Sequence, residues 1–382
     1  MIAGVHRPSR AARGMPALAL VAVGLLACGP APIAAPTLHP SLTAPADPTG
    51  PAGSTTPTVA PTPTPAAGSR PRIVIDTDVA ADDLIALASI LRDPSVEILA
   101  ITVAGTGETH CEPGVRVVRS FVTALIDGPL PVACGPADPL GDAQPFPDAW
   151  RAGADSGSGL TLPTPGFEAD PRPAQRILVD LAQVEFDAGR RLRLLTLGPV
   201  TNLASALELD PELPGKVQVY SMLGAVDVPG NVDVGPTPIA EWNAHADPTA
   251  ARRVLEAGFE LTLIPLDATN DTPLTQELFQ DLAADHAAGP ADLVFELLTR
   301  NPFMLEGGLY LWDPLAAAVI RNPDFVTTSE ATVRVVEGAG GDGGRLVHDP
   351  AGANVEFGDS ADRARFEAFL LDRLRFGGPR RT

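Results

Sequence analysis

Four aspartates lie within eight residues, directly after the short apolar run Ile73–Ile75, and they are Asp76, Asp78, Asp82 and Asp83. Like charges this close together repel, so some carboxyl groups must hold a proton or a cation must lie among them. Residues 84–91 predict a buried helix, and the partial positive charge at its N-terminus is too small to balance the cluster. A bound divalent cation is therefore the expected neutraliser. The alternative is a helix cap with loop acids that face water.

A metal site needs more oxygen ligands than this one loop supplies. Asp313 is a candidate, because it opens a predicted helix that has an apolar face, although a helix cap would explain it equally well. The sequence has no histidine and cysteine cluster near Asp78, which favours a hard cation. Carboxylate ligands favour Ca²⁺ over zinc.

The folded part alternates predicted strands and helices. The expected strands lie at 73–75, 96–103, 192–197, 217–223 and 261–266, and the expected helices at 83–91, 115–126, 174–187, 202–209 and 248–257. This pattern predicts a single α/β domain with a mostly parallel open sheet and helices on both faces. In such sheets ligands bind at the carboxyl ends of the strands, so the acidic cluster lies in one of the informative loops. Further helices are expected at 276–287, 292–300, from 313, and at 360–376, with a late strand at 331–336.

The N-terminal region is predicted to lie outside the fold. In residues 1–28, arginines precede a short apolar run, a layout typical of a cleaved signal segment. The run ends in Leu-Leu-Ala-Cys28, which resembles a bacterial lipobox. The alternative is an ordinary signal segment with an incidental cysteine. Residues 29–71 are rich in Pro, Thr and Ala and predict an extended linker, so the domain is expected over 72–378. We therefore expect an exported protein, held at the outer face of a bacterial membrane by its lipid alone.

Composition excludes some partners and leaves one covalent link open. The formal net charge is −20, and there is no basic patch to neutralise the phosphates of a nucleic acid. Cys111 and Cys134 could form a disulfide in an exported protein, and two free buried thiols are an equal alternative.

Five motifs, in order along the chain, resemble those of the nucleoside hydrolases, which cleave the N-glycosidic bond of ribonucleosides. They are Asp76-Thr-Asp-Val-Ala-Ala-Asp-Asp83, Val96-Glu-Ile-Leu-Ala-Ile-Thr-Val-Ala-Gly105, Leu197-Gly-Pro-Val-Thr-Asn202, Gly230-Asn231 with Ala240-Glu-Trp-Asn243, and Asp313-Pro-Leu-Ala316. The resemblance spans about residues 72–320. It implies a ribonucleoside as substrate, Ca²⁺ as cofactor, and a homodimer or homotetramer as a possible assembly.

The same resemblance implies a role for each matching residue. Asp78, Asp83, Asp313 and the main-chain oxygen of Leu197 would bind calcium, and Asp78 would also be the general base toward a water held by that ion. Asp82 and Asn243 would bind the ribose 2′-hydroxyl and its neighbours, and Asn231 and Glu241 would hold the 5′-hydroxyl. Asp76 would hold the loop. Carboxylates around the sugar would favour an oxocarbenium-like transition state.

The chain departs from the family pattern in three places. Thr106 stands where the family usually has an asparagine that contacts ribose, and the spacing from Asn231 to Glu241 is longer than in the shortest members. Trp312 stands where many pyrimidine-accepting members have a histidine that protonates the base. Trp312 and Trp150 resemble instead the pair that stacks on the base in the purine-specific branch. Each cation–π contact of this kind contributes about 0.5–2 kcal/mol, which assists departure of the base without carrying the barrier.

The sequence therefore predicts a calcium-dependent hydrolase of ribonucleosides with a preference for purines. Two alternatives remain open because of Thr106, Trp150 and Trp312. One is a lipoprotein that binds a nucleoside or ribose without turnover, and the other is a hydrolase of another ribosyl compound.

Overall fold

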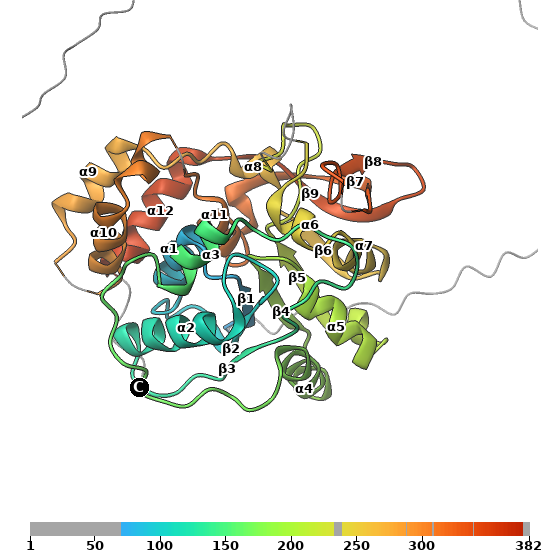
Figure 1. The fold of residues 1–382 in the computed structure, drawn as a ribbon, viewed down its shortest axis with the longest axis horizontal. Helices are drawn as coiled ribbons and strands as arrows, with labels where there is room; N and C mark the ends of the chain where they lie inside the picture. Colours follow the sequence, from blue (N-terminus) through green and yellow to red (C-terminus); the bar gives the residue numbers. More distant parts are fainter. Residues whose placement is uncertain (1–69, 233–238, 288, 308, 339, 377–382) are drawn as a thin grey trace, which may run out of the picture. The chain divides into compact units, whose positions relative to one another are not determined.

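The computed structural model describes residues 70–232, 239–287, 289–307, 309–338 and 340–376. In these residues nine strands form one sheet with the order β3-β2-β1-β4-β5-β6-β9-β7-β8 (Figure 1). The strands are β1 (Arg72–Thr77), β2 (Glu97–Val103), β3 (Val132–Cys134), β4 (Leu192–Thr196), β5 (Val217–Ser221), β6 (Glu260–Leu263), β7 (Val326–Val335), β8 (Leu346–His348) and β9 (Ala353–Ala361). The predicted signal segment, Cys28 and residues 29–69 of the predicted linker lie outside the described residues.

The helices connect these strands in the predicted alternation. They are α1 (Ala81–Ile90), α2 (Cys111–Leu125), α3 (Asp148–Asp155), α4 (Ala174–Asp187), α5 (Thr201–Leu209), α6 (Trp242–Ala246), α7 (Pro248–Glu256), α8 (Leu266–Thr269), α9 (Gln276–Ala284), α10 (Pro290–Arg300), α11 (Trp312–Val319) and α12 (Arg363–Phe376). Across the described part of the chain, every helix is too short or too polar to cross a bilayer.

The register of the parallel strands brings several loops to one edge of the sheet. Neighbouring strands are parallel throughout the series β3-β2-β1-β4-β5-β6-β9. Strand β7 is antiparallel to both of its neighbours, β8 and β9. Thr77 at the end of β1 is opposite Val103 at the end of β2. Thr196 at the end of β4 is opposite Ser221 at the end of β5. The loops after these four strands therefore leave the sheet side by side, which is where α/β sheets bind ligands.

Both faces of the sheet are covered, as predicted. Side chains of a strand alternate between faces, so Ile73 and Ile75 belong to one buried cluster and Val74 to the other. The first cluster also contains apolar side chains from helices α1, α2, α10, α11 and α12. The second contains those from α4, α5 and α7 (Figure 1). Burial on both faces explains why the strands read as continuous apolar runs instead of alternating with polar residues.

The structure corrects the predicted C-terminal helix. Residues 360 and 361 belong to β9, and α12 begins only at Arg363. Ser360 pairs with Thr327 of the antiparallel neighbour β7, and this long-range pairing outweighs the local helical pattern. Residues 331–335 of the last predicted strand form the second half of the longer β7, which ends one residue before the predicted boundary.

A disulfide joins Cys111, the first residue of α2, to Cys134, the last residue of β3, and so resolves the alternative that the sequence left open. The two cysteines are 23 residues apart, and closing a loop of that length stabilises a fold by about 3 kcal/mol. We expect reduction to lower Tm by roughly 5–10 °C in calorimetry. A reductant should leave Tm unchanged in the Cys111→Ser/Cys134→Ser variant. An equal Tm of the parent with and without reductant would contradict this expectation.

Candidate metal and sugar site

The turn from β1 into α1 holds its acids through a compact network of hydrogen bonds. The Thr77 hydroxyl donates to the Asp83 carboxylate and accepts the N–H of Val79 at 3.1 Å. The N–H of Asp78 donates to Asp83 Oδ1 at 3.2 Å. Val79 has φ +66°, a left-handed conformation that costs a β-branched residue about 1–3 kcal/mol. The surrounding hydrogen bonds thus hold a strained turn beside the clustered acids, which is typical of functional loops.

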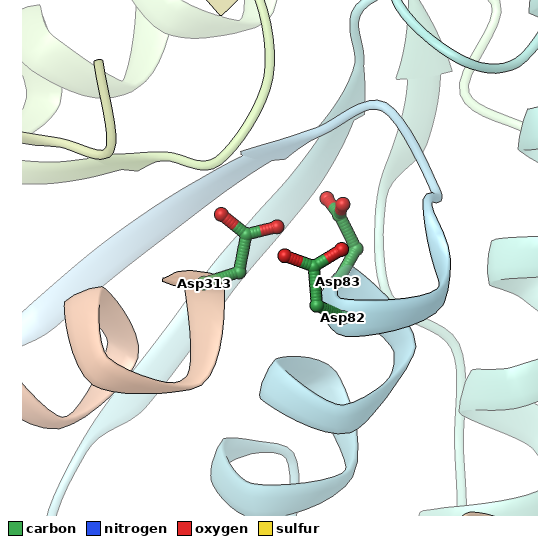
Figure 2. A group of neighbouring side chains, drawn as sticks. All are labelled: Asp82, Asp83 and Asp313. Carbon is green, nitrogen blue, oxygen red and sulfur yellow. The ribbon is translucent and has the colours of Figure 1, made fainter. Parts of the chain in front are cut away.

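Three buried aspartates from two helices face one another. Asp82 and Asp83 lie in the first turn of α1, and Asp313 lies in the first turn of α11, which packs against α1. Each offers one carboxylate oxygen, and these oxygens all lie within 4.8 Å of one another (Figure 2). The structure therefore brings the predicted ligands Asp83 and Asp313 together. It also places Asp82, to which the sequence assigned a sugar contact, in the same group.

Two carboxylate oxygens of this group have no hydrogen-bond partner within the described residues. They are Asp83 Oδ2 and Asp313 Oδ1, and both are buried. Leaving such atoms unpaired is costly in an apolar interior, whereas a cation between them would satisfy both. The donors are all oxygens, which suits a hard divalent cation. The residues present therefore fit a metal site, and Asp82, Asp83 and Asp313 would hold the ion.

Asp78 lies where three loops meet. Its side chain is buried, and its Oδ2 accepts the N–H of Glu108 from the loop after β2 at 2.9 Å. Gly107 of that loop and Gly198 of the loop after β4 approach so closely that a Cβ on either would overlap Asp78. Burial, followed by the charge of Asp83, raises the pKa of Asp78 well above its usual range. The Asp78 carboxyl group is therefore enclosed by two neighbouring loops and lies close to Asp83.

Burial and mutual repulsion favour protons on the cluster when no cation is present. Burial raises the pKa of Asp82 to about 8, with further contributions from the charges of Glu108 and Asp78. Burial likewise raises the pKa of Asp83 to about 6 and that of Asp313 well above its usual range. Protons and a divalent cation should therefore compete for the same carboxylates.

This competition predicts how stability changes with pH. Because the pKa values of Asp82 and Asp83 are raised on folding, the folded state binds more protons than the unfolded state. The protonated carboxyl groups therefore contribute stability at about pH 4 and below, and this contribution is lost as pH rises through about 6 to 8. We expect Tm of the metal-free protein to fall between pH 5 and pH 8, as measured by calorimetry. Excess Ca²⁺ should remove most of that slope, and Asp82→Asn should reduce it. A slope that calcium leaves unchanged would contradict this reading.

Asp76 has the loop-holding contacts that the sequence predicted for it. Its Oδ1 accepts the Thr102 hydroxyl at 2.6 Å and the Asn202 amide at 2.7 Å. Asn202 also donates to the carbonyl of Val103 at 3.0 Å. Burial raises the pKa of Asp76 to about 7. Asn202 thus ties α5 to β1 and β2, a role that its position at a predicted helix start did not reveal.

The Thr106 hydroxyl donates its hydrogen bond to another side chain of the protein. The Thr106 and Thr201 hydroxyl oxygens are 2.8 Å apart, and Thr201 donates to Asp247 Oδ2 at 2.8 Å. Since the Thr201 proton points to Asp247, the Thr106 proton must point to Thr201. Thr106 is therefore left with lone pairs only, so it can accept a hydrogen bond from a sugar hydroxyl but cannot donate one.

Asn243 and Leu197, predicted to bind sugar and metal, touch each other. The Asn243 amide donates to the Leu197 carbonyl at 2.9 Å and to the Met222 carbonyl at 3.0 Å. Both residues are buried; Leu197 directly follows β4, and Asn243 lies in the first turn of α6. Their assigned roles remain predictions, and the Asn243 contact orients the carbonyl proposed as a ligand.

The two residues predicted to hold the 5′-hydroxyl support α6. Glu241 caps this helix by accepting the N–H groups of Asn243 at 2.8 Å and Ala244 at 3.1 Å, and it also accepts the N–H of Gly224 at 2.9 Å. Asn231 Oδ1 accepts the N–H of Trp242 at 3.0 Å. The extra residues noted between Asn231 and Glu241 lie mostly at 233–238, outside the described residues.

The tryptophans occupy different surroundings. Trp150 on α3 is 46% exposed and packs its edge on the buried Trp242, with ring centroids 5.5 Å apart. Trp312 is half-buried, stacks on Tyr310 at 5.4 Å, and donates its Nε1–H to Asn270 at 3.1 Å. Within the described residues Trp150 and Trp312 have no ring contact with each other, so their pairing around a base remains a prediction.

Sequence reasoning missed two residues next to the site. The half-buried Glu108 follows β2. Its charge adds to the rise in the pKa of Asp82, whereas its main-chain N–H donates to Asp78 and lowers the pKa of that carboxyl group. Its position in one of the expected ligand loops was the available signal. Arg151 on α3 donates from Nη2 to the carbonyls of Gly105 at 2.9 Å and Thr109 at 3.1 Å, and so fastens α3 to that loop. No pattern in the sequence indicated this contact.

Comparison with known proteins agrees with this geometry. Residues 73–368 match the family model described as inosine-uridine preferring nucleoside hydrolase. A pyrimidine-specific ribonucleoside hydrolase of Shewanella sp. (strain ANA-3) is 30% identical, with 80% of this chain and 96% of that protein covered. A pyrimidine-specific ribonucleoside hydrolase of Escherichia coli O157:H7 is 28% identical, with 80% and 97% covered.

Solved structures show the same fold. The inosine-uridine preferring nucleoside hydrolase of Bacillus anthracis aligns with a TM-score of 0.66 at 25% identity, covering 80% of this chain and 99% of that one. The purine-preferring ribonucleoside hydrolase of Gardnerella vaginalis aligns with a TM-score of 0.67 at 26% identity, covering 80% and 98%. These relatives differ in the base they prefer, as their names state.

Proposed function

The chain belongs to the inosine-uridine preferring nucleoside hydrolase family and is an N-glycosidase that hydrolyses nucleosides, and from this premise we propose that it depends on calcium and prefers purine ribonucleosides. One observation supports the metal dependence above all. Asp82, Asp83 and Asp313 converge in a buried space, and two of their oxygens have no other partner. Several carboxylates around one position suit Ca²⁺, which accepts about six to eight oxygens.

In the proposed mechanism, the acids of the β1–α1 turn bind the sugar and activate water. A divalent cation held by the aspartates would favour their ionised forms and attract the oxygens of water and sugar hydroxyls. Asp78, fixed by the Glu108 N–H, takes the proton of the attacking water as general base. The remaining carboxylates favour the positive charge that develops on the sugar. Asn243 orients the Leu197 carbonyl through its side-chain amide.

Support for a purine preference comes from the exposed tryptophan. Trp150 offers an exposed aromatic side chain on α3, the helix that Arg151 fastens to the loop beside Asp78. A two-ring base gains more from stacking on such a surface than a single ring does. The pyrimidine-specific relatives argue in the opposite direction, so the base preference has to be measured.

A substrate panel tests this proposal. The protein, with Ca²⁺ present, is incubated with inosine, guanosine, uridine and 2′-deoxyinosine, and free base and reducing sugar are quantified. We expect release of base, faster for the two purines, and a preference for inosine over 2′-deoxyinosine of about 10²-fold or more, because the deoxy sugar leaves buried polar groups unpaired. Saturable binding without release would identify the nucleoside-binding alternative. Equal rates for ribose and deoxyribose would contradict the assigned sugar contacts.

We also propose export and lipid attachment at Cys28, on the residues before it. A single acyl chain gives only marginal membrane binding, so a lipoprotein anchor with several chains should keep the protein in the membrane fraction. Expression of the full chain and of Cys28→Ser in a bacterium, followed by fractionation, tests the point. The variant should leave the membrane fraction, and an unchanged distribution would contradict the anchor.

A further inference from the structure

Two residues one turn apart on α3 hold the loop after β2. Arg151 donates from Nη2 to the carbonyls of Gly105 at 2.9 Å and Thr109 at 3.1 Å. Asp155, four residues later and therefore on the same side of the helix, accepts the Thr109 hydroxyl at 2.9 Å and the N–H of His110 at 2.8 Å. It also accepts the Nδ1–H of His110 at 2.8 Å. A cation and an anion of α3 thus bind this loop at both of its ends.

The same loop has further anchors that do not involve α3. A Cβ on Gly105 would overlap the sulfur of Cys111 and lie 3.1 Å from that of Cys134, so the disulfide fills the space beside this residue. A Cβ on Gly107 would overlap Asp78. Loss of the contacts from α3 should therefore leave the loop in place beside Asp78 and shift α3 instead.

Helix α3 carries an exposed aromatic side chain next to the segment assigned to the sugar. Trp150 is exposed and packs its edge on the buried Trp242, with ring centroids 5.5 Å apart. Phe146, just before α3, stacks on the same buried ring at 4.8 Å. In the sequence Trp242 lies between Glu241 and Asn243, the two residues assigned to sugar hydroxyls. The start of α3 therefore rests on the sugar segment, and its body is fastened to the loop after β2.

We propose that Arg151 is a positioning residue that, together with Asp155, holds Trp150 where it can stack on the base of the substrate; this inference rests on the proposed hydrolysis of ribonucleosides. Helix α3 has eight residues, and a helix this short is not stable by itself in water, so its contacts with neighbouring elements fix its position. Stacking depends on the offset and tilt of the two rings. Arg151 therefore acts on base selectivity through Trp150, without touching the base.

The separate anchors of the loop predict which kinetic constant changes. Asp78 keeps its neighbours when the Arg151 contacts are lost, so the chemical step should be nearly preserved. A purine loses more than a pyrimidine does when the stacking surface moves, because its two rings gain more from stacking. The loss should therefore appear mainly in KM for inosine.

The test measures kcat/KM for inosine and for uridine, using the full chain with Ca²⁺ present. In Arg151→Gln the ratio of kcat/KM for inosine to that for uridine should fall about fivefold. Arg151→Lys keeps the charge and a donor, so its ratio should lie between those of the parent and Arg151→Gln. Arg191→Gln is the matched control and should keep the parent ratio. Arg191 also donates from Nη2 to two carbonyls, those of Pro214 and Val217, both at 3.0 Å, but it does so at the start of β5.

A double variant separates positioning of Trp150 from a general effect on the fold. Trp150→Ala removes the stacking surface and should lower the ratio by a factor similar to that of Arg151→Gln. If Arg151 acts through Trp150, adding Arg151→Gln or Arg151→Lys to Trp150→Ala should lower the ratio no further. A purely structural role of Arg151 would make the two effects independent.

The outcomes distinguish this inference from the proposed function. Release of base with a ratio that the Arg151 variants leave unchanged, or with independent effects in the double variant, would overturn the inference and leave the proposed function intact. No release of base from either nucleoside by the parent chain would overturn both. Tm of each variant shows that it is folded at the assay temperature, and Arg151→Lys carries the comparison if Arg151→Gln is unfolded there.

Discussion

Replacing Asp78 with asparagine is expected to lower kcat/KM for ribonucleosides by about 10³-fold or more. Asparagine keeps the size of the side chain and can still accept the Glu108 N–H, but it cannot take a proton from water. The loss should appear mainly in kcat. Steady-state release of base from inosine, with Ca²⁺ in excess, measures it.

The fold should survive this change and, without metal, should gain stability. Asp78 is buried beside Asp83, whose charge opposes its ionisation, so removing one carboxylate relieves repulsion. Tm of the metal-free variant should therefore equal or exceed that of the parent. Asp142→Asn provides the matched control, because Asp142 is exposed on a loop before α3, and it should keep parental activity. Retention of a tenth or more of the activity in Asp78→Asn would contradict the assigned role.

Removing divalent cations is the second change with a large expected effect. Dialysis against a chelator should lower the rate of base release by about 10²-fold or more, and added Ca²⁺ should restore it. The same treatment should lower Tm, because an ion at 100 times its Kd stabilises the folded state by about 2.7 kcal/mol. Protons then replace the ion on the buried carboxylates, so the metal-free protein remains folded near pH 5.

A ligand variant connects this loss to the described site. Asp313→Asn removes one of the three facing carboxylates, and it should raise the Ca²⁺ concentration for half-maximal activity by about tenfold or more. Full activity of the chelated protein would argue against metal dependence. An unchanged calcium requirement in Asp313→Asn would place the ion elsewhere.

Much of the scaffold was predictable because the parallel strands are buried on both faces. Their continuous apolar runs, such as Ile73–Ile75, stand out in the sequence, and the acids directly after the first run locate the ligand-binding edge. Asp313 was predictable as a partner of this cluster because it opens a helix with an apolar face. The convergence of the two helix starts, however, appears only when α1 packs on α11.

Other features depend on contacts between distant residues and left no local pattern. Strand β9 forms by pairing with β7, so the helix predicted from residue 360 was wrong over its first turn. The hydrogen bonds from Thr106 through Thr201 to Asp247 join residues from three separate loops and helices. Arg151 reaches the loop after β2 only because α3 folds over it. Spacing in the sequence cannot encode such contacts.

Calcium binding to the metal-free protein can be measured by titration calorimetry. We expect one ion per chain at pH 7, with heats that differ between buffers of different ionisation enthalpy, because the ion displaces protons from the buried carboxylates. Asp83→Asn and Asp313→Asn should each weaken this binding by about tenfold or more. Absence of saturable binding, or equal affinity in both variants, would contradict a metal site built from Asp82, Asp83 and Asp313.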